Sequence, residues 1–121
     1  MLNCLAVGLG GFVGALCRYL LGLIPLRNAH EFPVMTLLIN VLGAFAIGCI
    51  VGLATKNTDL DPRVVLFLKT GICGGFTTFS TFALETTDLL GAGETFAAAA
   101  YVVLSVVLGV SAVLAGQYVC R

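Results

Sequence analysis

Charged residues are spaced along this chain in a way that leaves little choice of fold. Lysine, arginine, aspartate and glutamate are all absent from residues 1–17, 32–55 and 95–120. A helix of roughly 20 apolar residues crosses a hydrocarbon core about 30 Å thick. Each charge-free run is therefore long enough for one membrane crossing.

The composition indicates a membrane protein without a soluble domain. Of the 121 residues, 60% are hydrophobic and 10% are charged, whereas an ordinary soluble domain is about one quarter charged. A fourth segment is less apolar and carries Lys69, Glu85 and Asp88. We predict an all-α membrane protein, a single domain over residues 1–121, with four transmembrane helices at about 2–24, 34–55, 64–90 and 95–119.

Two other interpretations of the apolar runs are weaker. A cleaved signal peptide would need a basic start and a small-residue cleavage site, but Arg18 and Tyr19 stand where that site belongs. We therefore expect a retained helix, followed by a short polar loop at residues 27–31. The five cysteines lie singly in apolar runs, which favours small buried side chains over a disulfide framework or a zinc site. A net charge of zero without a basic run indicates no nucleic acid, so the lipid bilayer is the partner that composition names.

The basic residues do not fix an orientation in the membrane. Four crossings place both termini on one side, together with Lys56, Arg63 and Arg121, against Arg18 and Arg27 on the other. Three cations against two is too small a bias for the positive-inside rule. We expect the chain to insert both ways, with dual topology, and to pair as an antiparallel homodimer.

Small residues recur four positions apart in the first two predicted helices. In lipid, such stripes let helix backbones approach closely, either between two chains or within one. The stripes are Gly10 with Gly14, Gly11 with Ala15, and Ala44 with Gly48 and Gly52.

The third segment is a poor helix in its middle, because glycine, threonine and serine crowd residues 71–81. As one straight helix, residues 63–90 would be about 42 Å long, well over the hydrocarbon thickness. We expect a break near Gly74 and Gly75. Unwound backbone at membrane depth is tolerated inside protein or beside a polar cavity, so the break predicts an ion site, with a simple glycine kink as the alternative. Free carbonyls near Gly74 and Thr77 suit a hard cation, and the following N–H groups suit an anion.

Phenylalanines recur every three residues after this break, and hydroxyl side chains lie between them. A phenylalanine stripe by itself is typical of a lipid-facing or core surface. Hydroxyl donors beside positive ring edges could instead replace the water around an anion. The residues concerned are Phe76, Phe79 and Phe82, with Thr77, Thr78, Ser80 and Thr81.

Several polar residues fall within the apolar helices, where such groups need partners. Asn40 could make an interhelical hydrogen bond or line a pathway. Tyr101 and Ser105 lie one turn apart on one helix face, although Tyr101 could also anchor the interface. For Arg18 we favour snorkelling over a pair with Glu85 or an anion, and we expect Glu85 and Asp88 to be interfacial.

Three motifs together resemble the CrcB/Fluc family of fluoride channels: GGFVGALCRY at residues 10–19, LIN at 38–40 and GGFTTFSTF at 74–82. The resemblance covers the whole chain. It implies a channel, not an enzyme, that passively exports fluoride from the cytoplasm across the cell (inner) membrane and reduces its toxicity. It also implies an antiparallel homodimer of multi-pass chains with dual topology and two fluoride pores, highly selective against chloride.

The resemblance further implies roles for individual residues. Phe79 and Phe82 would present ring edges to fluoride, and Asn40 would be the pore asparagine. A structural sodium ion would be held at the dimer interface by the backbone carbonyls of Gly74 and Thr77. The polar track would comprise Thr78, Ser80, Thr81, Tyr101 and Ser105. Position 109 is glycine, where members of the family can carry a second serine, so the far end of the track departs from the family pattern.

Three other functions remain as alternatives. A small multidrug-resistance-type cation exporter would need an embedded carboxylate for proton exchange, and the first, second and fourth helices contain no acid. A subunit of a larger membrane complex would not need a polar, broken helix. An enzyme is the weakest alternative, because His30 lies in a loop without a motif that places a nucleophile beside it.

Overall fold

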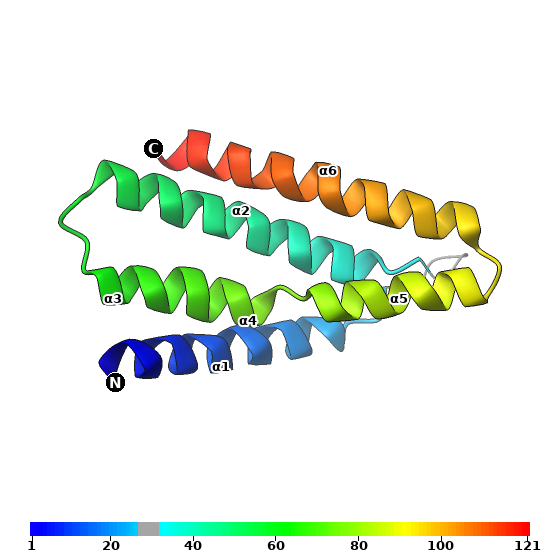
Figure 1. Ribbon diagram of the computed structural model, residues 1–121, viewed down its shortest axis with the longest axis horizontal. Coiled ribbons are helices and arrows are strands. Elements are labelled where there is room, and N and C mark those ends of the chain that lie inside the picture. Colours follow the sequence, from blue (N-terminus) through cyan, green and yellow to red (C-terminus); the bar gives the residue numbers. More distant parts are fainter. Residues whose placement is uncertain (27–31) are drawn as a thin grey trace.

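Four long helical spans lie side by side in the computed structural model, which describes residues 1–26 and 32–121 (Figure 1). Three spans are single helices: α1 (Leu2–Gly22), α2 (Val34–Lys56) and α6 (Thr95–Cys120). The third span, Pro62–Gly91, is built from four shorter segments. All four spans are long and apolar enough to cross a membrane, which confirms the prediction of an all-α chain with four spans. The loop predicted at 27–31 lies outside the described residues.

The third span changes its helical geometry three times. It begins with α3 (Pro62–Val65), where the Asp61 side chain accepts a hydrogen bond from the Arg63 N–H. It then widens into a π-helix, η1 (Leu66–Cys73), before one turn of α-helix, α4 (Gly74–Phe76). After a break it continues as α5 (Phe79–Gly91).

The predicted break near the middle of the third span is confirmed, and it begins two residues after Gly75. Gly74 and Gly75 are helical, and the extended residues are Thr77 and Thr78, with ψ angles of 156° and 113°. The span is therefore interrupted at two threonines, and Gly75 before them is a position of close helix packing instead.

Glycines on α1 and on the third span allow these two elements to pack closely. A Cβ atom on Gly10 would lie 2.8 Å from the Cα atom of Gly71, and one on Gly14 would lie 2.8 Å from the backbone nitrogen of Phe76. A Cβ on Gly75 would lie 3.0 Å from the Cα atom of Gly11. The stripe on α1 thus packs against the third span, alongside which α1 runs in the same direction (Figure 1).

The stripe on α2 packs against α6 in a similar way. A Cβ on Gly48 would lie 3.0 Å from Val113, and one on Gly52 would lie 3.0 Å from the carbonyl oxygen of Gln117. Both stripes therefore serve packing within one chain, which was one of the two roles considered for them.

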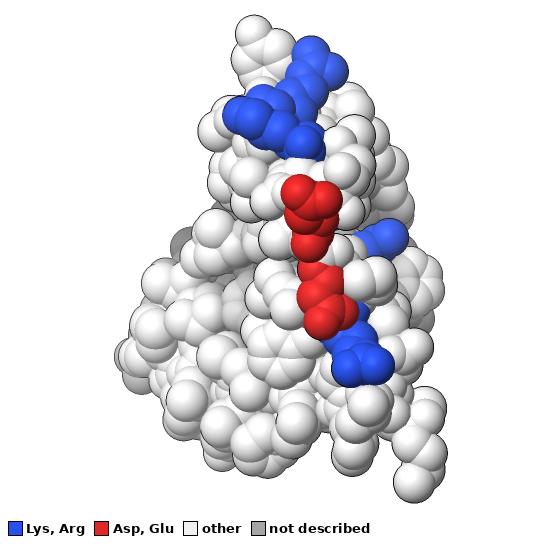
Figure 2. All heavy atoms as spheres, turned by 90° about the vertical axis from the view of Figure 1, so that its left-hand side faces the viewer, with Lys and Arg blue, Asp and Glu red and all other residues white. Residues whose placement is uncertain are grey.

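Both termini lie at the same end of the bundle, beside the turn between α2 and α3 (Figure 1). Charged side chains form a row across this end (Figure 2). Lys56, Asp59, Asp61, Arg63 and Arg121 are all exposed there, so this end suits the membrane surface. The flanks of the bundle expose many large apolar side chains, as expected for contact with lipid or with another membrane protein.

Candidate functional site

Asn40 holds the break of the third span in place. Its Oδ1 accepts a hydrogen bond of 2.8 Å from the Thr78 N–H, and its Nδ2 donates one of 3.1 Å to the Thr78 carbonyl. The amide thus replaces the helical partners of Thr78 on both sides. The interhelical hydrogen bond considered for Asn40 is confirmed, and one N–H of Nδ2 remains for another acceptor.

The two hydrogen bonds between Asn40 and Thr78 form an Asn40 clasp, which leaves two backbone carbonyls without their helical donors. In a continuous helix, the N–H groups of Thr78 and Thr81 would bond to the carbonyls of Gly74 and Thr77. Instead, Thr78 donates to Asn40, and the Thr81 N–H donates to the Thr78 hydroxyl at 3.2 Å. Within the described ranges, no hydrogen bond ends on the Gly74 or Thr77 carbonyl. These are the two carbonyls that we predicted from the sequence as ligands of a cation.

The hydroxyl groups after the break are joined to one another. Thr78 Oγ1 donates to Thr81 Oγ1 at 3.0 Å and lies 3.4 Å from Ser80 Oγ. The Thr77 hydroxyl belongs to a different group, because it donates to the carbonyl of Cys73 at 2.8 Å. The three predicted track residues Thr78, Ser80 and Thr81 therefore form one cluster at the start of α5.

Aromatic rings continue from this cluster toward α6. The ring centroids of Phe79 and Phe82 are 5.6 Å apart, and those of Phe82 and Tyr101 are 5.0 Å apart with an interplanar angle of 65°. Phe32 meets Tyr101 edge-on from the other side at 5.4 Å. Tyr101 is fully buried, so it is not the interface anchor that was considered for it.

A cavity of about 410 Å³ lies along the break, between α2, the third span and α6. It brings together most of the predicted site residues, although Ser80, Thr81 and Tyr101 do not line it. The Ser105 hydroxyl is buried and has no hydrogen-bond partner among the described residues. An unsatisfied donor in this position is unusual for a folded protein and fits a site that receives an acceptor. The lining includes Asn40, Gly74, Thr77, Thr78, Phe79, Phe82 and Ser105.

Glu85 is joined by a hydrogen bond to Tyr101, one of the predicted track residues. Its two carboxylate oxygens accept hydrogen bonds of 2.7 Å from the hydroxyls of Thr36 and Tyr101. Glu85 also lines a second cavity, of about 380 Å³, with Thr78 and Thr81. The spacing contained a signal for this: Glu85 follows Thr81 by four positions and so lies on the same helix face.

Arg18 does not snorkel toward the membrane surface. It is half-buried, and its Nε donates a hydrogen bond of 3.1 Å to the carbonyl of Gly75. Arg18 thereby joins α1 to the turn that precedes the break, and its side chain also lines the second cavity. The break is thus held from two sides, by Arg18 on α1 and by Asn40 on α2.

Comparison with known proteins shows the family of the chain. The family model described as CrcB-like protein, Camphor Resistance (CrcB), matches residues 5–117. The chain belongs to the CrcB family. Among its CrcB relatives is a protein of Ruminiclostridium cellulolyticum, named fluoride-specific ion channel FluC, which is 43% identical over 100% of this chain and 94% of its own length. A FluC protein of Nitrobacter winogradskyi is 46% identical over 97% of this chain and 94% of its own length.

Proposed function

We infer that this CrcB-family protein is a fluoride-selective channel that lets fluoride leave the cytoplasm passively through the cell (inner) membrane. The observation that carries this inference is the cavity at the break, which is lined by Asn40, by Phe82 and by Ser105, whose buried hydroxyl has no hydrogen-bond partner among the described residues. The relatives named fluoride-specific ion channels support the choice of ion.

Fluoride is small and strongly hydrated, so a pore must replace its water with donors at close range. Here those donors are the Ser105 hydroxyl, the spare N–H of Asn40 and the positive ring edges of Phe79 and Phe82. None carries a full charge, so the ion can bind and also leave. The driving force is the membrane potential, worth about 2.3 kcal/mol per charge for each 100 mV. Hydrogen fluoride enters cells as a neutral molecule and dissociates inside, so the passive pore returns fluoride without ATP.

We propose further that two chains pair in antiparallel orientation to complete the pores. Phe79 is 78% exposed in the single chain although it lines the cavity. Gly74 is also exposed, and a Cβ atom there would meet nothing within 4 Å. Both residues face open space beside the break, which is where a second copy would cover them. The polar track then runs from Ser105 past Phe82 to the cluster of Thr78, Ser80 and Thr81.

The two carbonyls released by the Asn40 clasp fit a structural sodium ion. Backbone oxygens are suitable ligands for a hard cation, and those of Gly74 and Thr77 have lost their helical donors. With a second copy, the same pair of carbonyls would come from each subunit. When bound, sodium would supply positive charge that ties the two breaks together. Sodium-free dialysis that left the dimer and its fluoride flux unchanged would contradict this part of the proposal.

The test of function is fluoride efflux from liposomes that contain the purified protein, followed with a fluoride electrode after a potassium ionophore is added. We expect rapid fluoride loss and no chloride loss. Efflux of both ions would refute selectivity, and no efflux from folded protein would refute the channel. The cation-exporter alternative is not supported, because the relatives are fluoride channels and both Glu85 oxygens are occupied by hydroxyl groups.

A further inference from the structure

Lys69 is a charged side chain within a membrane-spanning segment. It lies in η1, seven positions after the start of the third span, and is exposed. Among the described residues it makes no hydrogen bond and no ion pair. An ammonium group without a partner at this depth is costly in hydrocarbon, so it needs either water or an anion beside it.

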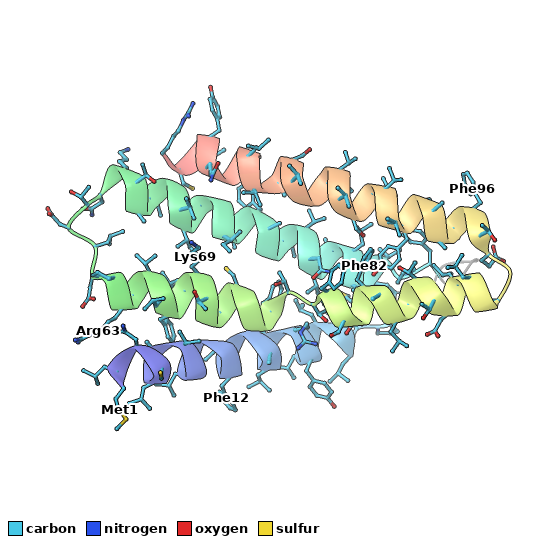
Figure 3. The ribbon with its side chains drawn as sticks, viewed as in Figure 1. Met1, Phe12, Arg63, Lys69, Phe82 and Phe96 are labelled. Atoms are coloured by element: carbon cyan, nitrogen blue, oxygen red, sulfur yellow. The ribbon has the colours of Figure 1, made fainter. Side chains whose placement is uncertain are left out.

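The structure places Lys69 on the cavity that contains the fluoride donors. It lines this cavity together with Asn40, Phe82 and Ser105, and it is the one charged side chain among the described lining residues. Figure 3 shows Lys69 and Phe82 on the same side of the third span, the side facing α2. The third span thus presents a cation and a ring to one continuous space.

The π-helical geometry contributes to this placement. Because hydrogen bonds in a π-helix join residues five positions apart, Lys69 lies about one turn from Gly74, and both residues line the cavity. Lys69 therefore lies nearer to the charged end of the bundle than the break, along the same wall. Asp59 and Asp61 are also at that end, but both are exposed in the turn between α2 and α3, where water screens them.

We propose that Lys69 is an anion-collecting residue, whose ammonium group raises the local fluoride concentration in the cavity ahead of the donors at the break. This proposal rests on the proposed function and adds a specific residue to it. A positive charge in a low-dielectric cleft concentrates anions and raises the rate at which they enter. Its effect is largest when fluoride and other salts are dilute, because the screening length is about 30 Å at 0.01 M and about 3 Å at 1 M.

The experiment compares Lys69→Gln with Arg63→Gln, which removes the same charge from an exposed residue that does not line the cavity. Fluoride flux is measured in liposomes at about 10 mM and at about 1 M total salt. At low salt we expect Lys69→Gln to conduct at least about threefold less than wild type, and Lys69→Arg and Arg63→Gln to conduct as wild type does. At high salt the Lys69→Gln deficit should disappear.

The outcomes separate the two proposals. A wild-type protein without fluoride flux refutes the channel itself. Wild-type flux with an equal rate in Lys69→Gln at both salt concentrations refutes the role of Lys69 and indicates a lysine that snorkels. A deficit of the same size at both salt concentrations also refutes it, because that result indicates altered structure. Lys69→Met gives the same change of charge and replaces Lys69→Gln if that variant aggregates.

Discussion

Asn40 has a structural role at the break that limits how its proposed role in transport can be tested. Two of its hydrogen-bonding groups are committed to Thr78, so at most one N–H is left for an ion. Losing Asn40 would therefore disturb the break as well as remove a donor. For this reason a ring, which has no hydrogen bonds to lose, gives a cleaner test of ion contact.

Phe82→Ile should lower fluoride flux roughly two- to tenfold, because an aliphatic side chain has no positive ring edge and an aromatic contact is worth about 0.5–1.5 kcal/mol. The variant should keep the elution volume of the wild type in detergent. Phe96→Ile is the matched control, since Phe96 is 88% exposed at the start of α6 and outside the cavity. Equal flux in wild type and both variants would remove ring edges from the mechanism.

Sequence reasoning singled out residues that line the cavity, but it missed the partners of two charged side chains. Asn40, Phe82 and Ser105 stand out as polar or aromatic residues in apolar surroundings, so they could be identified one at a time. Glu85 and Arg18 could not, because their partners are Thr36, Tyr101 and the Gly75 carbonyl, which only the packing of separate helices brings near. A charged residue near the end of an apolar run is interpreted from sequence as lying at the membrane interface, because its neighbours in the fold are not yet known.

The third span shows why a break is easier to predict than to locate. Glycine lowers helix propensity, but the helix continues through Gly74 and Gly75, and neighbouring backbone leaves no room for a side chain at Gly75. The helix stops at Thr77 and Thr78, where Asn40 from α2 offers competing hydrogen bonds. The π-helix of η1 was not predicted, since no residue type marks that geometry in the sequence.

The packing of helix α1 on the third span can be tested by a substitution at Gly14. Gly14→Ala would place a Cβ atom against the Ile72 carbonyl and 2.8 Å from the Phe76 nitrogen, and backbone atoms cannot move aside cheaply. We expect a loss of about 1–3 kcal/mol in stability, typical of overpacking, measured as a lower unfolding temperature in detergent.

Gly8→Ala is the control for this substitution, because the same methyl group on the same helix would meet nothing within 4 Å. It should unfold at or slightly above the wild-type temperature, because alanine favours the helical conformation more than glycine does. Equal unfolding temperatures for Gly8→Ala and Gly14→Ala would mean that α1 does not pack on the third span as described.

Hydropathy predicts the four-helix bundle, but it does not predict the orientation of the chain or its pairing with a second copy. Three charge-free runs and one less apolar segment, each of membrane length, indicate four spans, and alternation of crossings puts both termini at one end. Nothing in these runs determines which end faces the cytoplasm, because the cations that set orientation are nearly balanced. Orientation and pairing are therefore properties that need a measurement on the whole molecule.

Labelling of single-cysteine variants in intact spheroplasts provides that measurement. The five native cysteines are first replaced by serine or alanine. One cysteine is then added, either by Asn57→Cys at the end of the bundle with the termini or by Ala92→Cys at the opposite end (Figure 1). Both positions are exposed. With dual topology, an impermeant maleimide should label about half of each variant from outside, and the remainder after permeabilisation, because weak charge bias inserts the chain both ways.

Complete labelling of one variant and none of the other would show a single orientation. An antiparallel homodimer could not form in that case, and the exposed faces of Phe79 and Gly74 would need a different partner.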